Sequence, residues 1–312
     1  MKWSRLAAAA AALALAVPGL TGCSNSDEGA EKTAQFPAVT GEREHPTIEK
    51  GAGTPSTTTI SRVLTKGTGA EVKKSDTVCV DYIGQTWQGT VFDQSYNATE
   101  GPRVFSLNQV VPGWQKGLAG KHVGDRVQIV IPPEDGYGEQ GQGDLIPANA
   151  TLVFVVDIIG AIDVTDTSAL TKAKPNDKAD IPAWLKVGGK LGQKPTITVG
   201  DNPEIPTEQK VIILAEGTGE TIEADDYVAA HMSVVPLGDG EGQAAQSTWD
   251  MKSMQVTNGP VGQSPVYTGM KIGTRAIILT PGGQSSDGQK VPAAVYVIDY
   301  GAKMTATRGG SK

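Results

Sequence analysis

Four short stretches between residues 110 and 154 carry the pattern that decides the fold of the first half of this 312-residue chain. They read V-V-P-G-W-Q-K-G (110–117), V-G-D-R (123–126), I-P-P-E-D-G-Y-G (131–138) and L-I-P-A-N-A-T-L-V-F (145–154). None of them contains a nucleophile, a metal-binding cluster or a paired acid and base. Apolar and aromatic side chains instead surround a few hydrogen-bonding groups, which is the composition of a pocket for an apolar ligand.

The same region predicts one short helix set among strands. Pro112 suits the first turn of a helix, where its missing N–H costs nothing, and Trp114 and Leu118 are four residues apart and share one face. The runs V-Q-I-V-I (127–131) and T-L-V-F-V-V-D-I-I (151–159) are predicted strands, and the second is so continuously apolar that we expect it in the middle of a sheet. The predicted fold class is therefore α+β, with a twisted antiparallel sheet wrapped on one short helix.

Two further motifs lie upstream, V-D-Y-I-G (80–84) and V-F-D-Q-S (91–95). In order and spacing, the whole set resembles FKBP-type peptidyl-prolyl cis-trans isomerases over about Ile60 to Gly160. Each motif alone is weak, but the combination is specific. The resemblance implies an FKBP-like fold and an enzyme that interconverts the cis and trans forms of Xaa-Pro bonds in proline-containing polypeptides, without a cofactor.

The resemblance also implies the site. Trp114 is expected to be the floor under the proline ring, and Asp93 the polar group at the rim. The backbone N–H of Val111 and the hydroxyl of Tyr137 are expected to bond substrate carbonyls. The implied catalytic residues are Tyr82, Phe92, Asp93, Trp114, Tyr137 and Phe154, and the implied substrate-binding residues are Val110, Val111 and Ile146.

Taken one at a time, these residues have simpler interpretations. The aromatic residues on predicted strands and on the helix are more often core residues than ligand contacts. Asp93 is compatible with a turn, and Tyr137, in a glycine-rich loop, is the residue that packing explains least well. Only the combination indicates a binding site.

Three positions depart from the family pattern. Arg103 stands where the family often has an aromatic wall residue, Gln142 where eukaryotic members often have His, and Gln109 where an acidic residue is frequent. The resemblance implies macrolide ligands such as tacrolimus or rapamycin. Arg103 is expected to make one wall more polar and to weaken their binding.

The N-terminus has the pattern of a targeting segment. A basic start precedes the Ala- and Leu-rich run Leu6–Leu20, which is too short to span a bilayer comfortably. L-T-G-C at 20–23 resembles the bacterial lipobox, in which the Cys is lipidated; an ordinary secretory signal with a chance Cys is the alternative. We expect a lipoprotein signal peptide over 1–22, a lipid anchor on Cys23, a flexible tether over 23–39 and an extracytoplasmic protein anchored to the cell membrane.

Composition excludes several functions. The formal charge is −7, and without the basic residues of the signal peptide it is −9, which argues against nucleic acid as a partner. The three histidines His45, His122 and His231 lie in different elements without ligand spacing, so no metal is expected. With Cys23 lipidated, Cys79 remains alone, and no intrachain disulfide is expected.

The second half repeats the first at offsets of 149 or 150 residues. The repeated pairs are P-T-I at 46–48 and 195–197, G-T-G at 67–69 and 217–219, and V-G-D-R at 123–126 with I-G-T-R at 272–275. This predicts two FKBP-like domains, each with a sheet wrapped on one short helix, the second degenerate. The predicted boundaries are an isomerase domain over 40–162, a linker over 163–194, the degenerate domain over 195–303 and a tail over 304–312.

The second copy is expected to have lost most of the site. Aligning the two halves by sequence places Tyr82 opposite His231, Phe92 and Asp93 opposite Trp249 and Asp250, Trp114 opposite Gln263, and Phe154 opposite Tyr296.

Two functions are consistent with these patterns. The first is a lipid-anchored prolyl isomerase that assists the folding of secreted or envelope proteins, since proline isomerisation is a slow folding step. The second is a non-catalytic binding module or chaperone for unfolded or proline-rich segments, which the degenerate second copy favours. The intact motif set in the first half favours the enzyme.

Overall fold

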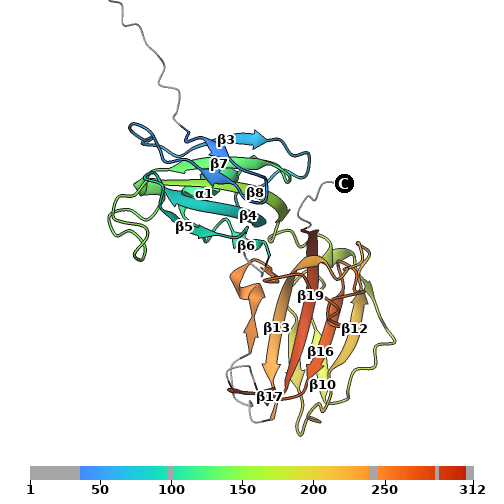
Figure 1. Cartoon of the computed structure of the whole chain (residues 1–312). Coiled ribbons are helices and arrows are strands. Elements are labelled where there is room, and N and C mark those ends of the chain that lie inside the picture. The colour runs from blue at the N-terminus through green and yellow to red at the C-terminus, as the bar shows by residue number, and fades with distance from the viewer. Residues whose placement is uncertain (1–35, 97–100, 239–244, 285–287, 307–312) are drawn as a thin grey trace, which may run out of the picture. The chain divides into compact units, whose positions relative to one another are not determined.

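The computed structural model describes residues 36–96, 101–238, 245–284 and 288–306 (Figure 1). The predicted signal peptide, Cys23 and most of the predicted tether lie outside the described residues. Among the residues described, no helix is both long and apolar enough to cross a membrane. Two separate antiparallel sheets organise the chain, and we call residues 36–162 the first lobe and residues 163–306 the second lobe.

The first lobe contains a six-stranded antiparallel sheet in the order β3-β7-β8-β4-β5, with β6 added to one end of β4. The nearly continuous apolar run forms β8, which lies in the middle of this order as predicted. Both faces of β4 and β8 are covered, so their residues are almost all buried. The strands are β3 (Ile60–Thr65), β4 (Thr77–Thr86), β5 (Val91–Gln94), β6 (Arg103–Ser106), β7 (Arg126–Ile131) and β8 (Leu152–Ile162).

The helix α1 (Pro112–Leu118) packs on one face of this sheet and begins at the predicted proline. Two glycines allow its close approach to β7. A Cβ atom on Gly113 would lie 2.3 Å from the side chain of Ile131, and one on Gly117 would lie 2.7 Å from that of Ile129. Helical glycines cost about 1 kcal/mol each relative to alanine. Tertiary packing against the sheet, rather than helix propensity, therefore holds α1 in place.

The opposite face of the sheet is covered by the segment before β3. Its hairpin of β1 (Val39–Thr40) and β2 (Thr47–Ile48) packs beside the buried Trp87. The side-chain amides of two buried glutamines on the sheet donate to backbone carbonyls of this segment, Gln128 to Pro37 at 2.8 Å and Gln85 to Glu49 at 2.9 Å. Residues 36–39, the end of the predicted flexible tether, are therefore part of a packed layer of the lobe.

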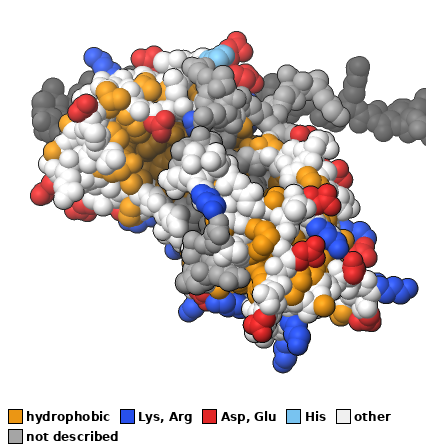
Figure 2. Space-filling model, turned by 90° about the horizontal axis from the view of Figure 1, so that it is seen from below, with side chains coloured by type: hydrophobic (Ala, Val, Ile, Leu, Met, Phe, Trp, Pro, Cys, Tyr) orange, Lys and Arg blue, Asp and Glu red, His pale blue; other side chains and the backbone are white. Residues whose placement is uncertain are grey.

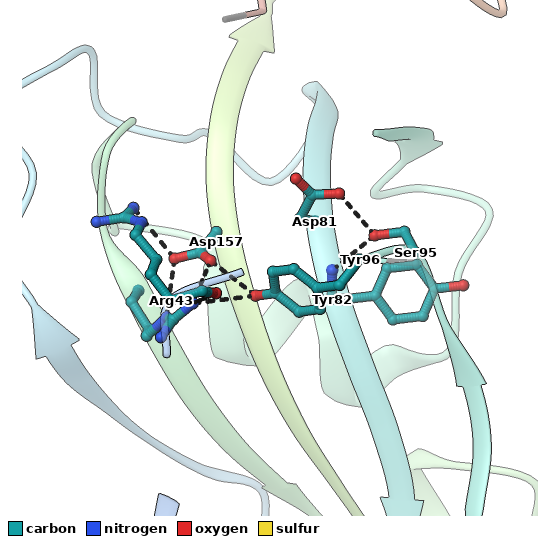
Figure 3. A network of polar contacts seen from close by, with 7 residues as sticks. Arg43, Asp81, Tyr82, Ser95, Tyr96 and Asp157 are labelled. Carbon is teal, nitrogen blue, oxygen red and sulfur yellow. Dashed lines mark hydrogen bonds and ion pairs between the residues drawn. The ribbon is translucent and has the colours of Figure 1, made fainter. Parts of the chain in front are cut away.

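A buried ion pair joins this layer to the sheet. Arg126 donates to both carboxylate oxygens of Asp157 at 3.0 and 2.6 Å, and also donates to the backbone carbonyl of Arg43 in the β1–β2 turn. The guanidinium of Arg43 lies 3.2 Å from the same carboxylate, and the hydroxyl of Tyr96 donates to it at 2.7 Å. Nearby, Ser95 donates to Asp81 at 2.9 Å and accepts from the backbone N–H of Tyr82 (Figure 3).

The second lobe contains a seven-stranded sheet in the order β14-β13-β19-β16-β12-β9, with β15 paired to β13. Read in the opposite direction, the order β12-β16-β19-β13-β14 corresponds to β3-β7-β8-β4-β5 of the first sheet, and β15 corresponds to β6. The strand β9 is additional. The strands are β9 (Lys174–Pro175), β12 (Lys210–Glu216), β13 (Asp226–Pro236), β14 (Gln246–Ser247), β15 (Gln255–Val256), β16 (Arg275–Thr280) and β19 (Ala294–Thr305). Two hairpins complete the lobe: β10 (Leu185–Gly188) with β11 (Thr196–Val199), and β17 (Gly283–Gln284) with β18 (Lys290–Val291).

The second lobe contains a corresponding buried ion pair with equivalent partners. Arg275 of β16 donates to Asp299 of β19 at 2.6 and 3.1 Å, and it donates to the backbone carbonyl of Gln193 in the β10–β11 turn at 2.6 Å. The indole N–H of Trp249 donates to the same carboxylate at 3.3 Å. The two lobes therefore share a buried Arg–Asp pair that fastens a preceding hairpin to the sheet.

The expectation of a short helix in each lobe is wrong for the second. In the part of the chain that the structure describes, α1 is the only α-helix, and residues 257–274 form turns between β15 and β16. Gly259, Pro260, Gly262 and Pro265 interrupt any helix there. The buried ring of Tyr300 fills the space, and its hydroxyl donates to the carbonyl of Val266.

The segment 163–194, predicted to be a linker, is largely ordered structure. It contains the 3₁₀ helix η2 (Leu170–Lys172) and the strands β9 and β10, and it buries Leu170 and Leu185. These strands have two to four residues and pair with partners that follow them in the chain, so their own alternation is too short to predict them.

Loss of the first ion pair is expected to destabilise the first lobe strongly. Replacing Arg126 by Met leaves the carboxylate of Asp157 buried with too few donors, which typically costs about 3–5 kcal/mol. Urea unfolding followed by tryptophan fluorescence measures the loss. Lys210→Met is the matched control, because its pair with Asp180 is exposed and worth at most about 1 kcal/mol. Equal effects of the two substitutions would contradict the structural role of the buried pair.

The second lobe is expected to lose stability in mild acid because of His231. Burial lowers the pKa of this 1%-exposed side chain to about 4. The unfolded chain takes up the proton near pH 6.5, whereas the folded lobe resists it until about pH 4, so stability falls as pH decreases between these values by up to about 3 kcal/mol. The difference in unfolding free energy between the natural chain and His231→Gln should change with pH over this interval. A constant difference would rule out this linkage.

Candidate active site

A cavity of about 550 Å³ opens in the first lobe between α1, the strands β4, β5, β6 and β8, and the loop that follows Tyr137. Its size is typical of ligand pockets, which span about 300–1,000 Å³. A hollow with hydrophobic walls and acidic side chains close by is visible on the face shown in Figure 2. The structure brings all nine sequence-predicted site residues to this cavity: Tyr82, Phe92, Asp93, Val110, Val111, Trp114, Tyr137, Ile146 and Phe154.

Trp114 lines the cavity and is only 4% exposed. Its ring meets three others edge to face, with centroid distances of 5.5 Å to Tyr82, 5.2 Å to Phe105 and 5.3 Å to Phe154. Edge-to-face contacts are favourable because the positive rim of one ring faces the negative face of the other. The shape of the cavity is therefore set by a rigid aromatic cluster.

A glycine in β4 leaves room for two of the wall rings. A Cβ atom at Gly84 would lie 2.6 Å from Phe154 and 2.7 Å from Phe92. These two rings themselves meet edge to face at 5.5 Å. Any side chain at position 84 would push the rings apart, so the glycine of the V-D-Y-I-G motif is needed for the wall.

The main polar feature inside the cavity is a hydrogen bond from the hydroxyl of Tyr82 to the carboxylate of Asp93. Burial raises the pKa of the Tyr82 hydroxyl above its usual value, and the bond to Asp93 raises it further. Tyr82 is therefore a neutral donor at physiological pH. This bond fixes Asp93, whose side chain is otherwise exposed, at the edge of an apolar wall.

Two hydrogen-bond donors at the cavity are available to a ligand. Neither the backbone N–H of Val111 nor the hydroxyl of Tyr137 has a hydrogen-bond partner among the described residues. Val111 directly precedes α1, where its carbonyl accepts from the N–H of Trp114 at 3.0 Å. The side chain of Tyr137 is 37% exposed. The two donors can hold an extended chain whose apolar side chain enters the cavity.

Six further residues line the cavity: Phe105, Gln109, Gln142, Gly143, Asp144 and Leu145. Gln109 and Gln142 were noted in the sequence as departures from the family pattern. Phe105 is not among the predicted site residues, although its alternation with Leu107 signals a strand side chain directed to one face. Gly143, Asp144 and Leu145 had no signal of their own, because a glycine-rich loop has no periodicity.

The expectation that Arg103 forms a cavity wall is wrong. Arg103 lies in β6, but it is not one of the residues that line the cavity, and the ring of Phe105 two residues later packs against Tyr82 and Trp114 instead. Residues two apart on a strand share a face, so Phe105 supplies an aromatic surface close to the expected position. The charge of Arg103 still acts on Tyr82, where it lowers the pKa of the hydroxyl.

The register of the buried ion pairs relates the second lobe to this cavity. Asp157 pairs with Asp81 across the strands, and Asp299 pairs with His231. His231 therefore corresponds to Asp81, and Met232 rather than His231 corresponds to Tyr82. A side-chain hydroxyl accepts from the backbone N–H at this position in both lobes. Thr248 accepts from Met232 at 2.9 Å, and Ser95 accepts from Tyr82.

The same register also replaces the expected counterparts of Phe92 and Asp93 in the second lobe. Trp249 corresponds to Tyr96, because each donates to the buried aspartate. By the strand pairing, Ala245 in the second lobe corresponds to Phe92 in the first, Gln246 to Asp93, and Val234 to Gly84. The expected match of Phe154 with Tyr296 agrees with the register. Phe154 pairs with Ile129 on β7, and Tyr296 pairs with Ile278 at the corresponding position of β16. Among the described residues of the second lobe, no α-helix corresponds to α1, which carries Trp114 in the first lobe.

No group of three or more His, Cys, Asp or Glu side chains suited to holding a metal ion occurs among the described residues. Cys79 is buried in β4.

Comparison with known proteins places these features in a family. Residues 69–159 match the model of the FKBP-type peptidyl-prolyl cis-trans isomerase family. The chain is 41% identical over 135 residues to the FKBP-type peptidyl-prolyl cis-trans isomerase FkpA of Escherichia coli, covering 43% of this chain and 47% of that protein. It is also 41% identical over 91 residues to FK506-binding protein 2 of Yarrowia lipolytica, covering 28% of this chain and 62% of that protein.

Among solved structures, a peptidyl-prolyl cis-trans isomerase of Pseudomonas syringae is 33% identical, with 34% of this chain and 76% of that chain covered and a TM-score of 0.31. The chain spans about half of the length of the FkpA relative and about three fifths of that of FK506-binding protein 2. All residues of the cavity fall inside the matched segment. Residues 69–159, which contain the whole cavity, are thus similar in sequence to the FKBP-type peptidyl-prolyl cis-trans isomerase family.

Proposed function

We propose that this protein catalyses the cis-trans isomerisation of Xaa-Pro peptide bonds, and that the cavity of the first lobe is the active site. The observation that carries the proposal is the cavity itself, which combines an aromatic floor at Trp114 with two unpartnered donors, the N–H of Val111 and the hydroxyl of Tyr137. The match of residues 69–159 to the isomerase family supports the same reaction.

The reaction needs no bond cleavage. Rotation about a peptide bond has a barrier of about 18–20 kcal/mol, because resonance ties the nitrogen lone pair to the carbonyl. In the transition state the amide is twisted, its carbonyl is less polar and its nitrogen is more basic. A site accelerates rotation when it binds this twisted form better than either planar form. An apolar cradle favours the less polar twisted amide, because the planar amide loses more by leaving water.

The proposed roles follow from the geometry of the cavity. Trp114 supports the proline ring, and the rings of Tyr82, Phe92 and Phe154 enclose it, with Val110 and Ile146 completing the wall. The N–H of Val111 and the hydroxyl of Tyr137 hold carbonyls on either side of the rotating bond. Asp93, fixed by Tyr82, lies at the edge where the polar backbone leaves the cavity.

We further infer that the protein acts outside the cytoplasm on secreted or envelope proteins, anchored by a lipid on Cys23. The lipobox-like sequence at 20–23 supports this location. An anchored isomerase would meet chains as they emerge, when proline isomerisation limits their folding. The cavity also suits macrolides such as tacrolimus or rapamycin, and a relative carries the name FK506-binding protein 2.

A second candidate function is a binding module or chaperone that holds unfolded or proline-rich segments. The observation that favours it is the second lobe, which has the strand order of the first but, in the part that the structure describes, no helix that corresponds to α1 and its Trp114. We propose that this lobe is a degenerate FKBP-like domain without isomerase activity. It would then serve binding or support rather than catalysis.

Removal of one donor should slow the isomerase without unfolding it. Tyr137→Phe deletes a hydroxyl that bonds nothing else in the described chain, so we expect kcat/KM to fall about five- to tenfold, the worth of one hydrogen bond of about 1–1.5 kcal/mol. NMR exchange on a short Xaa-Pro peptide with the full chain measures it. Tyr267→Phe, in the second lobe, is the control and should leave the rate unchanged. A natural chain that binds the peptide without speeding exchange would rule out the enzyme.

A matched pair of substitutions separates the two lobes. Phe154→Leu should lower kcat/KM about tenfold because it removes an aromatic wall worth about 1.5 kcal/mol, whereas Tyr296→Leu at the corresponding position should have no effect. Thermal melts confirm that both variants fold. The same chains are then tested for preventing aggregation of a proline-free client. Isomerase activity that depends equally on both positions would contradict an inactive second lobe, and client protection lost only with Tyr296→Leu would support the chaperone function.

A further inference from the structure

We propose that Asp144 and Leu145 select substrates with a lysine or arginine next to the proline. This proposal rests on the isomerase function proposed for the same cavity and adds a substrate class to it. Both residues line the mouth of the cavity, and both side chains are exposed, with Leu145 49% exposed.

The loop that carries these residues is held in place by its own backbone. Gln142 and Ile146 exchange hydrogen bonds, the N–H of Gln142 donating at 2.8 Å and that of Ile146 at 3.3 Å. This pairing leaves Gly143, Asp144 and Leu145 as the tip of a tight turn. Ile146 is buried in the core beneath the tip, so the turn is anchored to the cavity wall. The carboxylate and the isobutyl group are thus presented together beside the opening.

The charges around the cavity favour a cation at this tip. Asp93 and Asp144 are the two charged residues that line the cavity, and no Lys or Arg does. Asp93 already accepts the Tyr82 hydroxyl, and Arg103 acts electrostatically on that same tyrosine. Asp144 forms no hydrogen bond or ion pair with any described residue. Both carboxylates are negatively charged, but Asp93 is held by Tyr82, whereas Asp144 is free to turn toward a charged group of a ligand.

The neighbouring cation on the helix does not compensate this charge. The ammonium of Lys116 lies 2.6 Å from the carboxylate of Asp135 and is engaged there. A substrate with a positive charge is therefore attracted toward this side of the cavity, and one with a negative charge is repelled.

A lysine or arginine matches the tip in two respects at once. Its aliphatic stem can pack on the exposed Leu145 while its charged end reaches the carboxylate of Asp144, since long basic side chains bury their stems along apolar surface and keep the charge in water. An uncharged apolar residue would contact only Leu145, and a glutamate would be repelled by Asp144. The expected order of substrates is thus basic first and acidic last.

The test compares peptides that differ only at the residue beside proline. NMR exchange at about 0.15 M ionic strength, where the Debye length is about 8 Å, gives kcat/KM of the full chain for Lys-Pro and Glu-Pro peptides, and for peptides with Lys or Glu directly after the proline. A Leu-Pro peptide checks that the chain is an isomerase. We expect a Lys-to-Glu preference on at least one side of the proline. Asp144→Asn should reduce this preference about threefold, as expected for one exposed ion pair, and 1 M salt should reduce it similarly.

The controls separate this proposal from the isomerase function. Glu139→Gln removes a carboxylate that does not line the cavity, and it should leave the Lys-to-Glu ratio within about 1.5-fold of the natural chain, because exposed charges that are not in contact are largely screened. If Leu-Pro is isomerised but the ratio is unchanged by Asp144→Asn on both sides of the proline, the selectivity proposal is overturned and the isomerase stands. If no peptide is isomerised, the proposed function itself fails.

Discussion

A buried arginine-aspartate pair holds the layers of each lobe together. Arg126 with Asp157 and Arg275 with Asp299 lie at matching positions on adjacent central strands, and each arginine also donates to a carbonyl in a preceding hairpin. A carboxylate removed from water needs several donors to offset its lost hydration. In the first lobe the donors to Asp157 come from three places: Arg126 in the sheet, Arg43 in the hairpin and Tyr96 beside the edge strand. The charge of Asp157 is therefore satisfied only when sheet, hairpin and edge strand are all in place.

The cavity of the first lobe depends indirectly on the polar network around Asp157. Tyr96, which bonds Asp157, directly follows Ser95, which accepts from the backbone N–H of Tyr82. The polar network on one side of β4 and the cavity on the other thus share the same short segment of β4 and β5. A change in the buried pair would reach the cavity through Ser95 and the position of Tyr82. In the second lobe the network persists with Trp249 and Thr248, whereas Met232, Ala245 and Gln246 stand at the positions of Tyr82, Phe92 and Asp93. The fold therefore does not require these three residues of the cavity.

Much of the first lobe was predictable from its residues. The alternation and the apolar run at 151–159 predicted the strands and the central place of β8, and Pro112 predicted the start of α1. All nine predicted site residues lie at one cavity, although their catalytic and binding roles remain predictions. The sequence did not reveal Asp144 and Leu145 as cavity residues, because their position depends on a backbone pairing between Gln142 and Ile146 that no side-chain pattern records.

The sequence by itself determined the family resemblance, the repeat and the loss of the site motifs in the second half. Only the tertiary structure decided how the two halves correspond. The strand register makes Met232 the counterpart of Tyr82, one residue away from His231, which the sequence alignment favoured. Side chains on a strand alternate between faces, so a shift of one residue exchanges inside for outside. It also showed that 163–194 contains strands and that 257–274 forms no helix, because both depend on partners distant in the chain.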